Sequence, residues 1–154
     1  MRLQGKTAII TGSGRGIGQD IALAFAKEGA NIVVSDIDPV TTQQSNDLVG
    51  KHSKSIGIQA DVTKRTDVES LVQQAIANFG RVDILVNNAM RIVPGRLEEL
   101  SDEAWDTTIN IGLKGSFLMS QTVGKHMIAQ RDGCIINIAS IAGLAPYNFA
   151  GSYS

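Results

Sequence analysis

A glycine cluster near the N-terminus contains the first residues whose spacing points to chemistry. Thr11–Gly18 reads T-G-S-G-R-G-I-G and follows a short apolar run. Glycines between a strand and a helix let the backbone turn tightly, and they bring the helix amides and dipole close to a phosphate. The strict G-x-G-x-x-G spacing is absent, because its last position, counted from Gly12 and Gly14, is Ile17. The place of the cluster between a strand and a helix nevertheless favours nucleotide binding over a purely structural turn.

Asp36 is the second candidate. It lies 18 residues after Gly18, where a carboxylate can accept hydrogen bonds from an adenosine ribose. It would repel a 2′-phosphate, whereas Arg15 in the glycine loop would attract one. A fixed carboxylate outweighs a flexible arginine, so we predict NAD rather than NADP. The alternative role, a helix-capping aspartate, suits Asp38 better, because Asp38 precedes a proline.

Five apolar, β-rich runs alternate with helical patterns and would position these groups. The predicted strands are Thr7–Thr11, Asn31–Ser35, Ser55–Ala60, Val82–Val86 and Cys134–Ala139. The alternation predicts parallel βαβ units in an α/β, Rossmann-type doubly wound domain, with both faces of the sheet covered. Ligands of such sheets bind at the carboxyl ends of the strands. The glycine loop, Asp36, Asp61, Asn88 and Ser140 all follow a predicted strand, so we expect them on one rim.

Helix signals separate the strands. An apolar stripe of helical spacing is formed by Ile17, Ile21, Ala24 and Phe25, with Gly29 as a stop. Asp38 is predicted to cap the second helix, and Thr66–Glu69 reads as a capping box that opens the third.

A longer helical pattern begins after Ser101 and reaches about Arg131, interrupted at Gly112 and Gly115. Trp105, near its start, suits either a core or an interface. The Cys134 side chain is predicted to be buried and packed in the fold, as unpaired cysteines usually are.

Composition narrows the function classes. The chain has 154 residues, 43% of them hydrophobic and 19% charged, which suits one domain over 1–154. The net charge of −1 shows no basic excess for nucleic acid and no polybasic arm for a membrane. One cysteine and two separated histidines give neither a disulfide nor a metal cluster. Without an apolar segment long enough for a signal or a span, we expect a cytoplasmic protein.

Taken together, these residues resemble the short-chain dehydrogenase/reductase family. The matches run through the whole chain in the order of the family, at Thr11–Gly18, Asp61-Val62, Asn87-Asn88-Ala89, Asn110, Ser140 and Tyr153. The resemblance implies a nicotinamide cofactor and a small-molecule secondary alcohol or ketone that gains or loses hydride. It also implies a homo-oligomer, either a dimer or a tetramer.

The resemblance assigns roles residue by residue. The pyrophosphate loop would comprise Gly12, Ser13, Arg15, Gly16, Ile17 and Gly18. Asp61 and Val62 resemble the pair that contacts adenine, and Asn88 and Ala89 resemble the residues beside the nicotinamide ribose. The catalytic residues would be Asn110 in a proton relay, Ser140 holding the substrate oxygen, and Tyr153 as the general acid/base.

Two departures from the family pattern qualify these roles. Met90 stands where the family usually has glycine, so it either narrows the nicotinamide end of the cleft or points away. The lysine that normally follows the tyrosine by four residues is missing, because Ser154 ends the given chain. We therefore expect 1–154 to be the ordered part of a longer polypeptide and inactive alone, with strand Cys134–Ala139 left at an open edge.

Other functions stay open at this point. The chain suits a catalytically inactive dinucleotide-binding fragment or module, and less well a nucleotide-sugar-modifying enzyme. The substrate is open among sugars, polyols, steroids and acyl thioesters, because specificity depends on loops such as Met90–Leu97.

Overall fold

The computed structural model describes residues 1–154 and contains one five-stranded parallel sheet in the order β3-β2-β1-β4-β5. The strands are β1 (Thr7–Thr11), β2 (Asn31–Asp36), β3 (Ser55–Gln59), β4 (Ile84–Asn87) and β5 (Cys134–Asn137). The strand order reverses beside β1, because β2 pairs with one of its edges and β4 with the other. This topology confirms the predicted Rossmann-type α/β fold.

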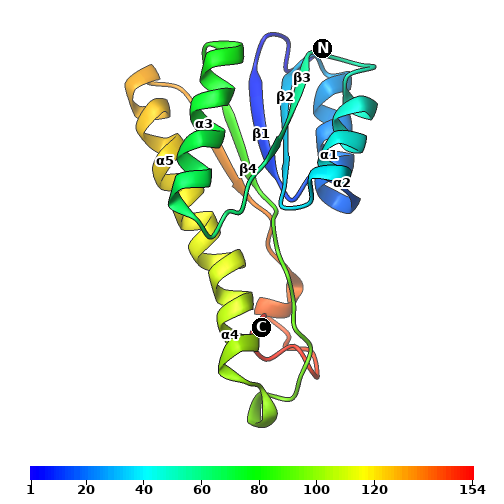
Figure 1. Cartoon of the computed structure of the whole chain (residues 1–154), viewed down its shortest axis with the longest axis vertical. Coiled ribbons are helices and arrows are strands. Elements are labelled where there is room, and N and C mark those ends of the chain that lie inside the picture. The colour runs from blue at the N-terminus through cyan, green and yellow to red at the C-terminus, as the bar shows by residue number, and fades with distance from the viewer.

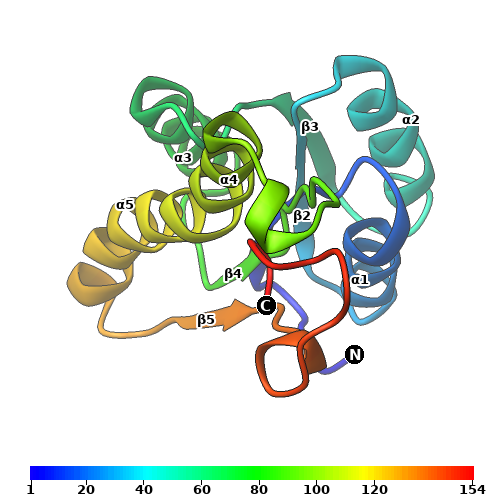
Figure 2. The same cartoon turned by 90° about the horizontal axis from the view of Figure 1, so that it is seen from below.

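The helices cover both faces of the sheet (Figure 2). They are α1 (Gly16–Lys27), α2 (Pro39–Val49), α3 (Arg65–Phe79), α4 (Asp102–Ile109) and α5 (Gly115–Gln130). α1 and α2 lie on one face and α3 and α5 on the other, whereas α4 continues the line of α5 beyond the ends of the strands (Figure 1). Two separate cores result: one joins the sheet to α3 and α5, and the other joins it to α1 and α2.

α1 confirms the predicted apolar stripe only in part: Ile21 and Phe25 are half-buried against the core, beside a more deeply buried row of small residues. Its buried residues are Gly18, Ala22 and Ala26, whereas Ile17 is 65% exposed. A β-carbon on Gly18 would lie 2.4 Å from the carbonyl oxygen of Gly12. Small residues on this face therefore let α1 approach the strand-to-helix loop closely, and a stripe of larger side chains would push it away.

The predicted long helix is continuous, without a break at its glycines. Ser101 caps it as expected, because its hydroxyl accepts a hydrogen bond from Ala104 N at 3.2 Å. Between α4 and α5 the backbone forms a π-helical turn, Asn110–Lys114. Such turns occur often at functional sites.

Several predicted boundaries are wrong by a few residues. β2 extends to Asp36, and β4 begins at Ile84 rather than Val82. The capping-box prediction is also wrong, since α3 begins at Arg65, before Thr66. Asp67 instead accepts a hydrogen bond from Asp61 N at 3.1 Å, so its carboxylate serves the preceding loop.

β5 forms an edge of the sheet, as predicted, and all four of its residues are exposed. The prediction that Cys134 is buried is therefore wrong. The physical reason is its place in the sheet: β5 pairs only with β4, and the strand has no neighbour on its other side.

A smaller lobe extends beyond the carboxyl ends of the strands (Figure 1). It contains α4, the 3₁₀ turn Leu97–Glu99 and the C-terminal segment. Gly95 N donates to Phe149 O at 2.9 Å, and the Ser152 hydroxyl donates to Thr108 Oγ1 at 3.1 Å. These contacts hold the C-terminal segment against α4 and so position Tyr153. None of the helices has the length and apolarity needed to cross a membrane.

Candidate functional site

The glycine loop is fixed to the end of β4. Asn88 Nδ2 donates to the carbonyl oxygens of Thr11 and Gly12, each at 3.0 Å. Gly12 has φ +62°, and a β-carbon there would lie 2.8 Å from Ala89 Cα. The loop therefore needs glycine for both its backbone conformation and its close approach to Ala89.

Thr11 organises this junction, although its side chain was given no separate role from the sequence. Its hydroxyl accepts hydrogen bonds from Asn88 N at 3.0 Å and Ala89 N at 3.1 Å. It also donates to Val86 O at 3.3 Å. A hydroxyl residue at the end of a strand, directly before a glycine loop, is the sequence signal that would have identified it.

The amino end of α1 is free to bind an anion. Its N-cap, Arg15, makes no side-chain capping hydrogen bond, whereas the Asp38 carboxylate caps α2 by accepting from Val40 N at 2.8 Å. Uncapped amides and the positive end of the helix dipole favour negative charge. α1 is thus suited to a phosphate group at the position that the glycine loop leads to.

The backbone holds the Asp36 carboxylate in place. Gly14 N donates to its Oδ2 at 3.0 Å, and Asp38 N donates to its Oδ1 at 3.3 Å. Each oxygen keeps a lone pair for a further donor. Asp36 therefore presents a fixed negative charge and two acceptors to the space beside the glycine loop.

A cleft of about 570 Å³ lies along this rim of the sheet, and we call it the strand-end cleft. Seven of the predicted cofactor residues line it: Gly12, Arg15, Asp36, Asp61, Val62, Asn88 and Ala89. Gly16 and Ile17 are exposed at the start of α1, outside its lining, and Gly18 is buried beneath the loop.

Ser13 is also outside the lining of the strand-end cleft, because its side chain points into the fold. It is fully buried, its hydroxyl donates to Ile10 O at 2.7 Å, and Ser35 N donates to that hydroxyl at 3.0 Å. Its contacts shape the glycine loop from beneath.

Asp61 contributes a second fixed charge to the strand-end cleft. Burial by itself would raise the pKa of Asp61, but hydrogen bonds from Thr63 and the nearby Lys64 ammonium hold that pKa below its ordinary value. The Thr63 hydroxyl donates to Asp61 Oδ1 at 2.7 Å, and Thr63 N donates to the same oxygen at 3.0 Å. Asp61 is therefore an ionised acceptor at neutral pH.

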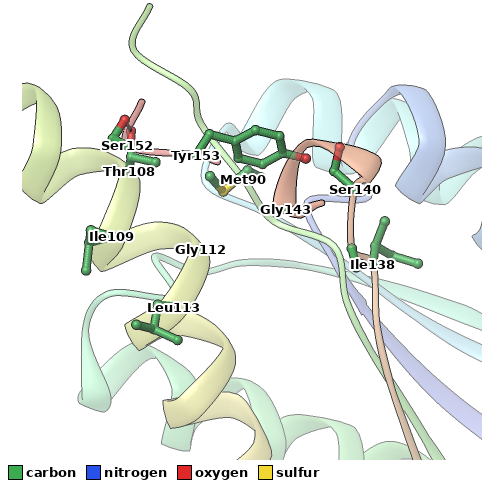
Figure 3. A pocket seen from close by; sticks show the side chains of 11 residues that line it. Met90, Thr108, Ile109, Gly112, Leu113, Ile138, Ser140, Gly143, Ser152 and Tyr153 are labelled. Carbon is green, nitrogen blue, oxygen red and sulfur yellow. Dashed lines mark hydrogen bonds between the residues drawn. The ribbon is translucent and has the colours of Figure 1, made fainter. Parts of the chain in front are cut away.

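Ser140 and Tyr153 line a second cavity of about 340 Å³, which we call the tyrosine pocket. The Tyr153 phenol points across Met90 toward Ser140 (Figure 3). Ser140 Oγ accepts a hydrogen bond from Ala142 N at 3.1 Å, which leaves its own hydrogen free to donate. None of the eleven lining residues is charged. The pocket thus holds the hydroxyls of Ser140 and Tyr153 in uncharged surroundings, together with those of Thr108 and Ser152, which are hydrogen-bonded to each other.

Asn110 does not line the tyrosine pocket. It begins the π-helical turn and faces a neighbouring hollow, which it shares with Asp61 and Thr63. The structure therefore brings together two of the three predicted catalytic residues, and places the third on the π-helical turn, facing a neighbouring hollow.

Met90 lines both the strand-end cleft and the tyrosine pocket. Of the two orientations left open by the sequence, the structure supports the one in which its side chain narrows the passage between the cavities. Because both cavities share this residue, the strand-end cleft and the tyrosine pocket are neighbours on the same rim.

The chain is similar to many proteins of one family. Residues 6–154 match the family described as short chain dehydrogenase. The hydroxy(phenyl)methylsuccinyl-CoA dehydrogenase subunit BbsD of Thauera aromatica is 42% identical over 97% of this chain. The chain spans 63% of the length of that relative.

Solved structures agree with this match. A short-chain dehydrogenase/reductase from Burkholderia xenovorans superposes with a TM-score of 0.94 at 36% identity, over 99% of this chain and 63% of that one. An NAD⁺-bound xylitol dehydrogenase superposes with a TM-score of 0.93 at 27% identity, over 99% of this chain and 60% of that one.

Proposed function

The chain belongs to the short-chain dehydrogenase/reductase family, and from this premise we propose that it is an NAD-dependent oxidoreductase that interconverts a secondary alcohol and a ketone. One observation carries the proposal: the strand-end cleft and the tyrosine pocket meet at Met90. A dinucleotide in the cleft would thereby have its reactive end beside two hydroxyl groups that can handle a proton.

The residues of the strand-end cleft fit NAD. The uncapped amino end of α1 and the glycine loop would hold the pyrophosphate. Asp36 would accept hydrogen bonds from the adenosine ribose, with Asp61 and Val62 beside the adenine. Asn88 and Ala89 would border the nicotinamide ribose. When bound, the nicotinamide supplies the acceptor or donor of hydride.

Ser140 and Tyr153 would carry the proton chemistry. The free hydrogen of Ser140 donates to the substrate oxygen and orients it. As a phenolate, Tyr153 Oη would take the proton of the alcohol as hydride leaves the carbon; as a phenol, it would return that proton to the substrate oxygen in the reductive direction. Asn110, which begins the π-helical turn outside the tyrosine pocket, would relay that proton toward solvent.

Replacement of Tyr153 by phenylalanine tests the proposal. In a complete, active form of the chain, the variant keeps the ring and loses the proton-transfer group, so turnover of NAD with secondary alcohols should fall about 10²–10⁴-fold while the Kd for NAD stays nearly constant. Ser140→Ala should show a smaller loss. Both effects are measured by NADH absorbance and by calorimetric titration.

Tyr147→Phe is the matched control, because Tyr147 is 55% exposed and does not line the tyrosine pocket. It should leave turnover unchanged. Full turnover by the Tyr153 variant would refute the acid/base role. Tight NAD binding without turnover of any alcohol would instead favour the alternative of a dinucleotide-binding module.

A further inference from the structure

The thioether of Met90 rests on Gly112. A β-carbon on Gly112 would lie 2.6 Å from Met90 Sδ and 3.2 Å from its Cε. Gly112 is in the π-helical turn and does not have a positive φ, so its backbone conformation does not require glycine. Glycine destabilises a helix relative to alanine. The contribution of Gly112 is therefore the space that it leaves for Met90.

Met90 lies next to the position that the reacting carbon of the substrate would occupy. It lines both cavities and is 38% exposed. Hydride passes between the nicotinamide in one cavity and a carbon held near Tyr153 in the other, so the substrate carbon must come close to this side chain. Figure 3 shows Met90 beside the Tyr153 ring, with Gly112 on the helix behind it.

The surroundings of Met90 in the tyrosine pocket are apolar. Ile109 and Leu113 line one side, from the helix that carries Gly112, and Ile138 lines the other from the end of β5. A charged substituent would lose its hydration there without gaining a partner. An uncharged substituent would meet the Met90 side chain as the boundary toward the strand-end cleft.

We propose that Met90 is a specificity-determining residue that limits the size of the uncharged substituent on the reacting carbon, and that Gly112 is the positioning residue that seats it. The inference rests on the proposed function, because it takes the tyrosine pocket as the substrate site. It adds to that function a limit on the size of the substituent, and it identifies Met90 and Gly112 as the residues that set this limit.

The first test compares substrates of graded size. 2-Butanol and 1-phenylethanol are offered with NAD to a complete, active form of the protein and to its Met90→Ala and isosteric Met90→Leu variants. Met90→Ala should raise the kcat/KM ratio of the larger to the smaller alcohol about tenfold or more, since hydrophobic pockets discriminate by this much per missing group. Met90→Leu should keep the original ratio, and a ratio that Met90→Ala leaves unchanged would overturn the inference.

The second test examines whether Gly112 acts through Met90. Gly112→Ala should change the ratio or the Kd for NAD when Met90 is present, and should change neither when combined with Met90→Ala. Gly124→Ala is the matched control, because a β-carbon on Gly124 meets nothing within 4 Å. An equal effect of Gly112→Ala in both backgrounds would refute the seating role.

A binding measurement separates this inference from the proposed function. The quenching of NADH fluorescence reports the Kd of butanone and of acetophenone in the ternary complex when it is measured in the Tyr153→Phe background, where NADH is not consumed by turnover. Tighter acetophenone binding by Met90→Ala supports the size limit even if no alcohol is oxidised, in which case only the proposed function fails. Unchanged or absent binding of both ketones overturns the size limit.

Discussion

At the scale of single residues, the selectivity of the strand-end cleft depends on how Asp36 is held. The Gly14 amide and the Asp38 amide each fix one carboxylate oxygen, at 3.0 and 3.3 Å. The side chain therefore cannot easily rotate away from a 2′-phosphate. Repulsion between two unit charges at about 4 Å is of order 4 kcal/mol at an effective dielectric constant of about 20. This repulsion is larger than the attraction between a 2′-phosphate and an exposed arginine such as Arg15.

Asp36→Ala should therefore reduce the preference for NAD over NADP. Loss of the acceptors should raise the Kd for NAD about tenfold, while loss of the charge should lower the Kd for NADP. Asp36→Asn separates the two causes, because it keeps an acceptor oxygen and removes the charge. Calorimetric titration of both cofactors against the three proteins measures this. Equal Kd values for NAD and NADP in the unmodified protein would mean that Arg15, rather than Asp36, determines the cofactor preference.

The sequence was sufficient to find residues whose role follows from local position. Asp36, Asp61 and Ser140 end strands of a parallel sheet, so their common rim follows from topology alone. Thr11 and Met90 were harder, because their contacts depend on distant segments. The partner of the Thr11 hydroxyl, Asn88, is 77 residues away in the chain, and the seat of Met90 is a glycine on another element.

At the scale of elements, an ionic network ties the amino ends of three strands together. Lys6 precedes β1, Arg81 and Asp83 precede β4, and Asp132 precedes β5. Lys6 Nζ lies 2.9 Å from Asp132 Oδ2, and an Arg81 nitrogen lies 3.1 Å from the same oxygen. The buried Asp83 accepts a hydrogen bond from Thr7 N at 2.8 Å and pairs with Arg81. The network lies at the end of the sheet opposite the site.

Asp132→Asn should destabilise the protein at pH 7, and the effect should become smaller as the pH falls below 3.8. The hydrogen bond from Lys6, together with the Arg81 charge, holds the pKa of Asp132 below its ordinary value of 3.8. A lowered folded-state pKa stabilises the protein at a pH above the unfolded value, and that contribution disappears as the pH falls through the folded-state pKa. The difference in Tm between the two proteins should therefore close on acidification.

Asp20→Asn is the control for this measurement, because Asp20 is exposed on α1 and forms no ion pair. Its Tm should follow that of the unmodified protein at pH 7 and below pH 3.8. A difference between Asp132→Asn and the unmodified protein that stayed constant as the pH fell below 3.8 would show that packing, rather than charge, is the cause.

Element types were predictable, whereas their faces and ends were not. Short, β-rich apolar runs identified all five strands, and Asp38 and Ser101 marked two helix starts. The buried face of α1 depends on how closely the glycine loop approaches it, which periodicity does not encode. The start of α3 was missed because Asp67 bonds to the preceding loop. Cys134 was placed in the core because an apolar strand does not reveal whether it is an edge.

At the scale of the whole molecule, apolar side chains gather on the outer face of α5. Phe117 is 55% exposed and Ile128 is 78% exposed. They are 11 residues apart, so they lie on one helix face, with Gln121 and Gly124 at the intervening turns. Their exposure shows that this face does not pack against the sheet. The homo-oligomer that we predicted from the family resemblance would give it a partner.

We therefore expect two copies of the chain to associate through α5. An isologous contact would set Phe117 and Ile128 of one copy against the same helix of the other, with Gly124 allowing close approach. A Phe117→Lys/Ile128→Lys variant should have a lower mass by analytical ultracentrifugation than the unmodified protein, since each copy would bury an unpaired charge. Leu48→Lys, on α2 across the sheet and 40% exposed, should leave the mass unchanged. Two results would exclude α5 as the interface. The unmodified protein could prove to be a monomer, or the double variant could have the same oligomeric mass as the unmodified protein.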